Sequence, residues 1–374
     1  MLVLEGLVSF KTGKLNSNAA KIDGKFPFFT CSQETFLTDT WSFDGEYVLL
    51  GGNNAAGIYP LKYFKGKFDA YQRTYAIRSI DEKKLLTRYT YYAFRLQLEL
   101  MKSISTGVTT KFLTLSLLNK TKIPVPPILT QQKIVSILSV YDDFIENNTR
   151  RIRILEEMAQ AIYSEWFVNF RFPGYEGVRM VESEFGQIPE EWKILELDEI
   201  ADIQWGDTST TKSSYITDGF IAYSASGPDG FLDYYDYDRV GIVLSAIGAN
   251  CGKTWYVRGK WSCIKNTIRF WAKNDNLTTE FLYFASINPD FWPRRGAAQP
   301  FISQGDAKKI KILCPEKKVV DEFSKHVICL MMMIDNLSYQ NTNLRRTRDL
   351  LLPKLISGEI DVSGLDIRIP EVEA

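Results

Sequence analysis

Mostly apolar side chains recur at alternating steps of four and three residues in two long stretches of the chain. In the first stretch these positions are Ile134, Leu138, Tyr141, Ile145, Asn148, Ile152, Leu155, Ala159, Ile162 and Trp166. In the second they are Phe323, Val327, Leu330, Ile334, Leu337, Asn341, Leu344, Arg348, Leu351 and Leu355. This spacing is that of the a and d positions of a heptad helix. We therefore predict two long helices, over residues 128–170 and 316–360, each spanning roughly 50 Å.

Each predicted helix carries one asparagine near the middle of its seam, Asn148 in the first and Asn341 in the second. A polar seam residue lowers stability but fixes register and partner choice. Each asparagine is equally compatible with a tolerated position near the surface. Proline-rich breaks precede both helices, and Thr130 is the predicted N-cap of the first. Pro353 predicts a kink or an end in the second helix, and Ser357-Gly358 predicts its stop.

Shifting the chain by 189 residues aligns two long stretches without a gap over about 60 residues. The matched pairs include Gly107 with Gly296, Phe112 with Phe301, Lys120 with Lys309, Lys122 with Lys311, Pro126 with Pro315, Ile145 with Ile334, Asn147 with Asn336 and Leu155 with Leu344. Upstream, Gly66-Lys67-Phe68 resembles Gly259-Lys260-Trp261 once insertions are allowed. Self-similarity at a fixed offset indicates repeated structural units, so we predict two copies of one plan.

The segments outside the heptads predict globular units of mixed α/β (α+β) class. Short runs of strand-forming residues alternate with Gly/Asn turns, at Tyr47–Leu50, Tyr71–Ile77, Gly241–Leu244 and Thr267–Trp271. A helical patch at Lys84–Met101 is matched by one at Thr279–Phe291. The predicted order is a globular unit over 1–127, a helix over 128–170, a Pro/Gly-punctuated connector over 171–190, a globular unit over 191–315, a helix over 316–360 and a tail over 361–374.

Charge and composition narrow the class of protein. The formal net charge is zero, but in residues 1–125 the 17 lysines and arginines exceed the 10 aspartates and glutamates by seven. At least one globular unit is therefore basic although the whole chain has no net charge, so the net charge does not exclude nucleic-acid binding. The five cysteines form no C-x-x-C pair and His326 is the single histidine, so neither a disulfide framework nor a zinc site is indicated. No membrane span or signal pattern is recognisable, and we expect a cytoplasmic protein.

Several local phrases of the chain resemble those of the specificity subunit of Type I restriction-modification systems. The phrases are Ile123-Pro124-Val125-Pro126-Pro127 with Gln131-Gln132-Lys133-Ile134, Trp166-Phe167-Val168-Asn169-Phe170-Arg171-Phe172, Pro189-Glu190-Glu191-Trp192, and Leu352-Pro353-Lys354-Leu355-Ile356-Ser357-Gly358-Glu359-Ile360. Together with the globular–helix–globular–helix order, the resemblance covers nearly the whole chain. One departure is that the Trp-containing lead-in of the second unit has no full counterpart before Leu4-Glu5-Gly6, so the N-terminal edge of the first unit is expected to be shortened.

The resemblance implies that residues 1–127 and 191–315 are target-recognition domains, each reading one half of a bipartite, asymmetric DNA sequence. It implies that the two helices pair as an antiparallel coiled coil, hold the half-sites apart and dock methyltransferase subunits, two of them in our expectation. Restriction/translocase subunits would join through the complex. The chain itself would be non-catalytic and hold no cofactor, with S-adenosylmethionine, ATP and Mg²⁺ in the partner subunits. The alternative is a coiled-coil scaffold that binds proteins and has no sequence-specific DNA binding.

Base-edge and phosphate contacts need short polar side chains and Arg or Lys on loops. In the first unit the candidates are Lys14, Asn16, Asn18, Asn53, Asn54, Tyr71, Gln72, Arg73 and Lys111. In the second they are Lys212, Tyr223, Ser224, Asn250, Lys253, Lys265, Asn266, Arg294, Arg295 and Gln299. Each asparagine among them is also a common turn former, and each lysine a common solvated side chain.

Two short motifs resemble catalytic signatures without meeting their requirements. Gly248–Thr254 has the lysine and threonine of a phosphate loop, but only three residues separate its glycines where four are required. Asn288-Pro289-Asp290-Phe291 resembles the Asn-Pro-Pro-Phe signature of adenine methyltransferases, with aspartate where the second proline belongs and no glycine-rich cofactor loop nearby. We therefore expect no catalytic or metal site in this chain.

Overall fold

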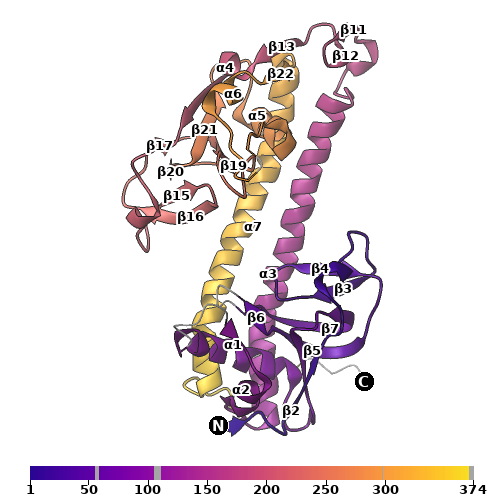
Figure 1. Ribbon diagram of the computed structural model, residues 1–374, viewed down its shortest axis with the longest axis vertical. Coiled ribbons are helices and arrows are strands. Elements are labelled where there is room, and N and C mark those ends of the chain that lie inside the picture. The colour runs from indigo at the N-terminus through magenta and orange to yellow at the C-terminus, as the bar shows by residue number, and fades with distance from the viewer. Residues whose placement is uncertain (55–58, 105–110, 297, 370–374) are drawn as a thin grey trace. The chain divides into compact units, whose positions relative to one another are not determined.

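The computed structural model describes residues 1–54, 59–104, 111–296 and 298–369, and the chain divides into two compact units. Unit 1 comprises Met1–Asn148 with Tyr339–Ala374, and unit 2 comprises Thr149–Ser338. Each unit therefore combines one globular part with one half of each long helix, α3 and α7 (Figure 1). The predicted α/β class with two long helices is confirmed.

Unit 1 is built on a six-stranded sheet with strand order β2-β8-β5-β7-β3-β4. Its elements are β1 (Leu2–Val3), β2 (Val8–Thr12), β3 (Phe26–Phe29), β4 (Thr35–Thr38), β5 (Phe43–Gly51), β6 (Asn53–Asn54), β7 (Leu61–Ala70), β8 (Thr74–Ser79), α1 (Thr87–Ile104), β9 (Lys111–Phe112), α2 (Leu115–Lys120), β10 (Lys122–Ile123) and the first half of α3 (Ile128–Tyr163). Helix α1 packs against β5, β7 and β8, so it covers one face of the sheet.

Unit 2 contains two four-stranded sheets, with orders β14-β21-β18-β19 and β16-β15-β20-β17. Its elements are β11 (Met180–Ser183), β12 (Gly186–Pro189), β13 (Lys193–Glu196), α4 (Leu197–Ile200), β14 (Ala201–Trp205), β15 (Phe220–Ser224), β16 (Gly227–Leu232), β17 (Tyr237–Asp238), β18 (Gly241–Ser245), β19 (Thr254–Val257), β20 (Lys260–Cys263), β21 (Thr267–Ala272), α5 (Thr279–Ser286), α6 (Gln304–Lys308), β22 (Lys311–Cys314) and the first half of α7 (Lys317–Ser357). Helix α5 packs against β18, β19 and β21.

The two units share one topology, as the sequence repeat predicts. The order β2-β8-β5-β7 of unit 1 matches β14-β21-β18-β19 of unit 2, and in both units the next sheet pairing is parallel, β3 with β7 and β15 with β20. The single long strand β7 thus corresponds to two strands, β19 and β20. The chain divides them at Gly259, whose φ of +72° is a left-handed conformation that glycine adopts freely.

Helices α3 and α7 run in opposite directions within each unit. In unit 1 Arg348 of α7 bonds Asp142 of α3, while Lys133, nearer the start of α3, donates to the carbonyl oxygens of Ser363 and Leu365 beyond the end of α7. In unit 2 the aromatic rings of Tyr163 and Trp166, at the end of α3, contact Phe323, near the start of α7.

The seam positions predicted from the heptads are all buried or half-buried. Asn148 is 6% exposed and Asn341 is 3% exposed, so neither asparagine lies near the surface. A buried amide costs free energy unless it is paired, and such residues favour one register of two helices over others. Of the two interpretations that the sequence left open, the burial supports the one in which these asparagines fix register.

The helix ends differ from the predicted ones in three places. Helix α3 begins at Ile128, so Thr130 lies inside its first turn and is not the N-cap. Its α-helical part ends at Tyr163 and continues as one π-helical turn over Ser164–Val168. Helix α7 passes through Pro353 and ends at Ser357, followed by Gly358 with φ of +82°, as predicted for the stop. The helix continues beyond the proline because Leu355 and Ile356 are buried in the core of unit 1.

The connector and the first strand also have structure that the sequence did not specify. Residues predicted as a connector contain the hairpin β11–β12, in which Ser183 and Gly186 form the last pair. Strand β1 pairs with β10 over two residues, whereas its counterpart β13 pairs with β22 over four. The first strand is thus shorter than its repeat.

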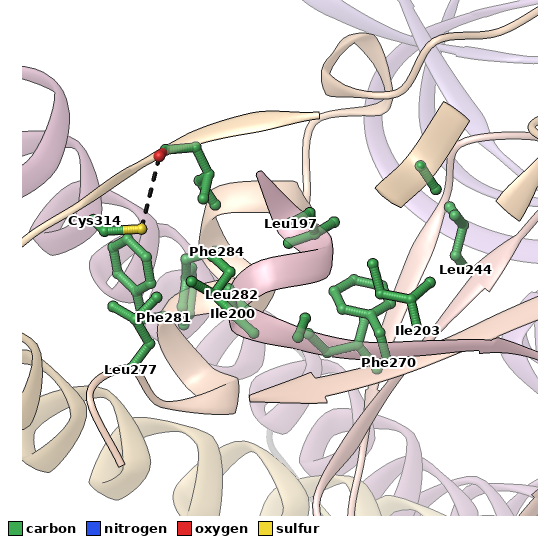
Figure 2. Packing of buried hydrophobic residues seen from close by; sticks show 14 of the residues in the cluster. Leu197, Ile200, Ile203, Leu244, Phe270, Leu277, Phe281, Leu282, Phe284 and Cys314 are labelled. Carbon is green, nitrogen blue, oxygen red and sulfur yellow. Dashed lines mark hydrogen bonds between the residues drawn. The ribbon is translucent and has the colours of Figure 1, made fainter. Parts of the chain in front are cut away.

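Each unit has its own hydrophobic core. In unit 2, Leu197 and Ile200 of α4, Ile203 of β14, Phe270 of β21 and Phe281 of α5 pack together, as Figure 2 shows. The core of unit 1 joins the sheet and α1 to both long helices through residues such as those at the start of α3 and the end of α7. No helix within the described ranges has the length and apolar character that crossing a membrane requires.

The two globular parts are attached to their helix segments by different contacts. In unit 1 Tyr92 of α1 donates a hydrogen bond to Asp142 of α3, which also pairs with Arg348 of α7. Shifted by 189 residues, Asp142 corresponds to Met331, and Arg348 corresponds to Ala159. These two residues line a cavity of about 1050 Å³ in unit 2. At these two positions the ion pair of unit 1 is therefore replaced by apolar side chains beside a cavity in unit 2.

Candidate nucleic-acid interface

A glycine follows the first strand of each main sheet at a close crossing of two backbones. A Cβ added to Gly13 would lie 1.8 Å from the carbonyl oxygen of Ala70, and one added to Gly206 would lie 2.7 Å from that of Cys263. Both distances are too short for any side chain. The absence of a side chain therefore lets the loop after β2 or β14 lie directly against the turn that precedes β8 or β21.

Backbone hydrogen bonds of the same kind fix this turn in both units. In unit 1 they run from Tyr71 N to Phe29 O (2.8 Å), from Gly52 N to Arg73 O (2.8 Å) and from Gly13 N to Thr74 O (3.3 Å). In unit 2 they run from Ile264 N to Tyr223 O (2.9 Å), from Ala246 N to Asn266 O (3.0 Å) and from Gly206 N to Thr267 O (2.9 Å). The turns over residues 71–73 and 264–266 are thus structural counterparts.

A fourth segment joins the same place in each unit. Leu113 N donates to Gly52 O at 3.0 Å, and Ile302 N donates to Ala246 O at 2.8 Å. We call the assembled segments the loop edge. It comprises residues 13–18, 51–54, 71–73 and 111–113 in unit 1, and residues 206–214, 246–253, 264–266, 294–296 and 298–302 in unit 2. The structure thus brings together candidate segments that lie far apart in the sequence.

On the loop edge of unit 1 the candidate side chains are open to solvent. Lys14, Asn16, Asn18, Gln72 and Arg73 are exposed, and Tyr71 is half-buried. Among the residues that the structure describes, no ion pair holds Lys14 or Arg73. The backbones of Asn53 and Asn54 pair with Phe112 and Lys111, but the side chains of Asn53, Asn54 and Lys111 lie outside the described residues, as does Gly107. This edge carries unpaired positive charge.

On the loop edge of unit 2 Lys212 is held by a carboxylate. Asp229 pairs with the ammonium group of Lys212 and accepts hydrogen bonds from Ser224 (2.8 Å) and Tyr215 (2.9 Å). Burial alone would raise the pKa of Asp229, but these three donors hold that pKa below its usual value. Lys212 also donates to Ser226 at 3.1 Å. The Asp229 carboxylate thus orients the lysine and partly neutralises it.

Both candidate arginines of unit 2 are paired as well. Arg294 contacts Asp290, and Arg295 contacts Asp306, each at 2.5 Å. Gln299 is exposed. Because Asp306 also accepts a hydrogen bond from Ser303 at the start of α6, its carboxylate is fixed by the fold.

The remaining candidates of unit 2 differ in whether their side chains contact other groups of the protein. The amide nitrogen of Asn250 donates to Ala225 O at 3.3 Å, and the Lys253 ammonium lies 5.5 Å from the centre of the Trp255 ring. Lys265 is exposed, and Asn266 is half-buried with φ of +73°. Asparagine tolerates this left-handed conformation better than most residues.

Two predicted contact residues are not available at the surface. Tyr223 is 7% exposed and Ser224 is 3% exposed. Burial raises the pKa of the Tyr223 phenol to about 12. Tyr223 packs against Trp261, and Ser224 donates to Asp229. The prediction that these side chains face nucleic acid is therefore corrected: both residues lie in β15 of the second sheet, where Tyr223 is packed in the hydrophobic cluster around Trp261 and Ser224 is bonded to Asp229.

The sequence missed one segment of unit 1. The turn between β3 and β4, residues 30–34, lies at the loop edge, where the Cys31 thiol contacts Arg73 O at 3.5 Å. Beside it, burial lowers the pKa of Lys62 to about 8, and its ammonium group donates to Glu34 O at 2.6 Å. Ala222–Ser226 of unit 2 is its counterpart, so aligning the two strand ends β3 and β15 was the signal that locates it.

The motifs that resemble catalytic signatures form ordinary turns. In Gly248–Thr254, Cys251 N donates to Gly248 O at 3.0 Å and Lys253 N donates to Asn250 O at 2.9 Å. Asn288 caps a short 3₁₀ turn by accepting from Asp290 N. Within the described part of the chain, no three His, Cys, Asp or Glu side chains are grouped to hold a metal ion.

Known proteins that this chain resembles are specificity subunits of Type I restriction systems. A family model described as "Type I restriction modification DNA specificity domain" matches residues 3–157 and 189–328. The EcoDI specificity subunit of the Type I restriction enzyme of Escherichia coli is 25% identical over 394 aligned positions, which cover 95% of this chain and 87% of that protein. The MjaIX specificity subunit of Methanocaldococcus jannaschii is 26% identical, covering 76% of this chain and 72% of that protein. The crystal structure of a Type I restriction-modification S subunit from M. genitalium shares the fold, with a TM-score of 0.60, 19% identity and 95% of each chain covered.

Proposed function

Because this chain belongs to the Type I restriction modification DNA specificity family, we propose that it recognises a bipartite, asymmetric DNA sequence, one half with each loop edge. As a member of this family it is a recognition subunit and not a catalytic one. The observation that carries the proposal is the duplicated loop edge, in which the same backbone frame presents different polar side chains in the two units.

The chemistry of the two edges suits contact with DNA. Phosphate contacts position a protein on the duplex, and Arg, Asn and Gln side chains read base edges in the major groove. Unit 1 offers unpaired cations such as Lys14 and Arg73, which attract the phosphate backbone at long range. In unit 2, Lys212, Arg294 and Arg295 would exchange a carboxylate partner for DNA. Different residues in the two edges imply different half-sites, and hence an asymmetric target.

We further propose that the long helices dock methyltransferase subunits, two per chain, which in turn recruit restriction/translocase subunits. Large apolar side chains lie outside the seam and are open to solvent. On α3, Val140 is 50% and Phe144 is 58% exposed, and on α7, Met332 is 59% and Met333 is 46% exposed. Exposed apolar groups four residues apart, such as Val140 and Phe144, share one helix face and suit a helical partner. S-adenosylmethionine, ATP and Mg²⁺ would belong to those partners.

The proposal is tested by DNA binding of the chain together with its methyltransferase partner. We expect binding to a duplex that contains the target to weaken steeply as salt rises, since binding releases counterions from neutralised phosphates. Competition by duplexes that lack the target should be much weaker. Binding that is indifferent to both salt and sequence would overturn the proposal.

The target itself is found by sequencing modified adenines in cells with and without the gene. A split motif that disappears on deletion is the expected result. A methylome unchanged by deletion, in cells where the partner subunits are present, would contradict the recognition role.

A further inference from the structure

The turn over residues 71–73 of unit 1 and its counterpart over residues 264–266 of unit 2 are held through their own backbone atoms. N–H groups of the turn donate to the neighbouring strand, and its carbonyl oxygens accept from the loop after β5 or β18 and from the side chains of Cys31 and Thr267. The side chains at the tip of each turn take no part in these bonds. The residues at the tip of each turn are therefore free to differ without altering the frame.

Those tip residues do differ. Unit 1 has Gln72-Arg73, and unit 2 has Lys265-Asn266. Gln72, Arg73 and Lys265 are exposed, and Asn266 is half-buried. Within the described part of the chain, none of the four side chains makes a hydrogen bond or an ion pair. Each is thus available to a ligand without first breaking a contact inside the protein.

Four other candidates at the loop edge of unit 2 have partners. Lys212 is bound by Asp229, Arg294 and Arg295 each contact an aspartate, and the amide of Asn250 donates to a backbone oxygen. A side chain that is already paired loses that partner when it contacts DNA, which reduces the net gain. The two turns differ from these four residues because their side chains lose no partner.

The four residue types match base-edge chemistry. Arginine binds the O6 and N7 atoms of guanine with two hydrogen bonds, and lysine contacts the same atoms. Glutamine and asparagine pair in the same way with N6 and N7 of adenine. Both turns thus carry one cation and one amide, but in opposite order along the chain.

We propose that Gln72-Arg73 and Lys265-Asn266 are specificity-determining residues of the two half-sites, each pair reading purine bases in the major groove. This inference rests on the proposed DNA-recognition function. Arg73 and Lys265 select guanine, and Gln72 and Asn266 select adenine. The paired cations of unit 2 contribute affinity common to all sequences.

The test uses the full chain in complex with its methyltransferase partner, with base preference measured by selection from a randomised duplex library and by the methylated motif in cells. Arg73→Ala should lower discrimination about 10-fold or more at one position of one half-site and leave the other half-site unchanged. The matched control is Arg179→Ala, which removes an arginine side chain that is 77% exposed and remote in sequence from either loop edge. It should leave the motif unchanged.

The second unit supplies an independent test. Lys265→Ala should alter only the other half-site. Asn266→Gly removes the amide while glycine keeps the φ of +73°, so the turn is retained and base preference should relax at one position. Asn266→Ala removes the same amide but adds backbone strain, so comparing it with Asn266→Gly separates loss of the amide from distortion of the turn. Thermal unfolding of each variant identifies a loss of fold.

Different results distinguish a failure of the proposed DNA-recognition function from a failure of the specificity role of the two turns. If the unaltered complex yields no split motif, the proposed function fails. If it yields one, and folded variants of both turns weaken binding uniformly or leave both half-sites unchanged, the specificity role of the turns is wrong and these side chains are phosphate contacts or solvated. A change in both half-sites from one variant also overturns the inference.

Discussion

Replacing Arg348 by methionine removes the centre of the polar network that joins α1 to α3 and α7 in unit 1. The guanidinium group bonds Asp142 at 2.5 Å and Asp349 at 3.0 Å, and its side chain is 8% exposed. Tyr92 donates to the other oxygen of Asp142 at 2.6 Å. Methionine keeps most of the length of the arginine side chain, so the change removes charge and hydrogen bonds more than packing.

The expected loss in the free energy of unfolding depends on the Asp142 carboxylate, which is left without its arginine partner. Breaking a buried ion pair by removing one partner costs about 3–5 kcal/mol when the other charge is fully buried. The Asp142 side chain is 24% exposed and keeps the Tyr92 hydroxyl, so we expect a value near the lower end, about 3 kcal/mol. Asp142→Asn should cost only about 1–2 kcal/mol, because Arg348 keeps Asp349. The double variant should lose about 2–3 kcal/mol, less than the sum of the single losses.

Urea unfolding of the four proteins measures these differences, provided that each unit is followed separately. Seven of the eight tryptophans lie in unit 2, so tryptophan fluorescence reports chiefly on that unit. Hydrogen exchange of peptides from residues 134–148 and 341–357 reports on unit 1. A loss below about 0.5 kcal/mol for Arg348→Met, or additive losses in the double variant, would refute the argument that this network stabilises the attachment.

Three further changes test other contacts. Gln131→Leu should destabilise unit 1 by about 3 kcal/mol, because this fully buried amide makes three hydrogen bonds to backbone atoms, whereas Gln132→Leu should change the urea midpoint little. Gly206→Ala should lower the thermal midpoint of unit 2, since the added Cβ lies 2.4 Å from a threonine oxygen and 2.7 Å from two carbonyls; an unchanged midpoint would argue against the close crossing. The pKa of Asp229 is lower in the folded protein, so its stabilisation is present above about pH 4 and is lost as the pH falls through the folded value; Asp229→Asn should flatten this part of the pH profile of unfolding.

The sequence predicted the elements whose signals extend over many residues. Twenty seam positions at a period of 3.5 specify two long helices regardless of any single residue, and a constant offset of 189 residues specifies a duplicated fold. Between the two outcomes predicted for Pro353, a kink or an end of the helix, local rules could not choose, because tertiary packing decides. Pro353 lies inside α7 because the residues after it are buried in the core of unit 1, and the free energy of that burial exceeds the cost of one lost backbone hydrogen bond.

The fold brings the candidate segments together but does not leave every candidate side chain open to solvent. Tyr223 and Ser224 have the residue types of DNA contacts, yet both are buried in β15, and a strand pattern of five residues does not reveal that both of its faces are buried. Residue type likewise gave no sign that Lys212 is held by Asp229, because the two residues lie on different elements brought together by the fold. Exposure and pairing depend on the tertiary structure.

The hydrogen bonds that the two loop edges share join backbone atoms, which every residue type except proline provides in full, so they leave almost no trace in the sequence. The exception is the glycine at each crossing, Gly13 and Gly206, where the close approach excludes any side chain. This arrangement has a consequence for recognition. A turn held by the side chains at its tip would lose its shape when those side chains change, whereas these turns keep their shape while Gln72-Arg73 in one unit becomes Lys265-Asn266 in the other. The backbone bonds that leave little trace in the sequence would therefore allow two copies of one fold to bind different DNA half-sites, as proposed above.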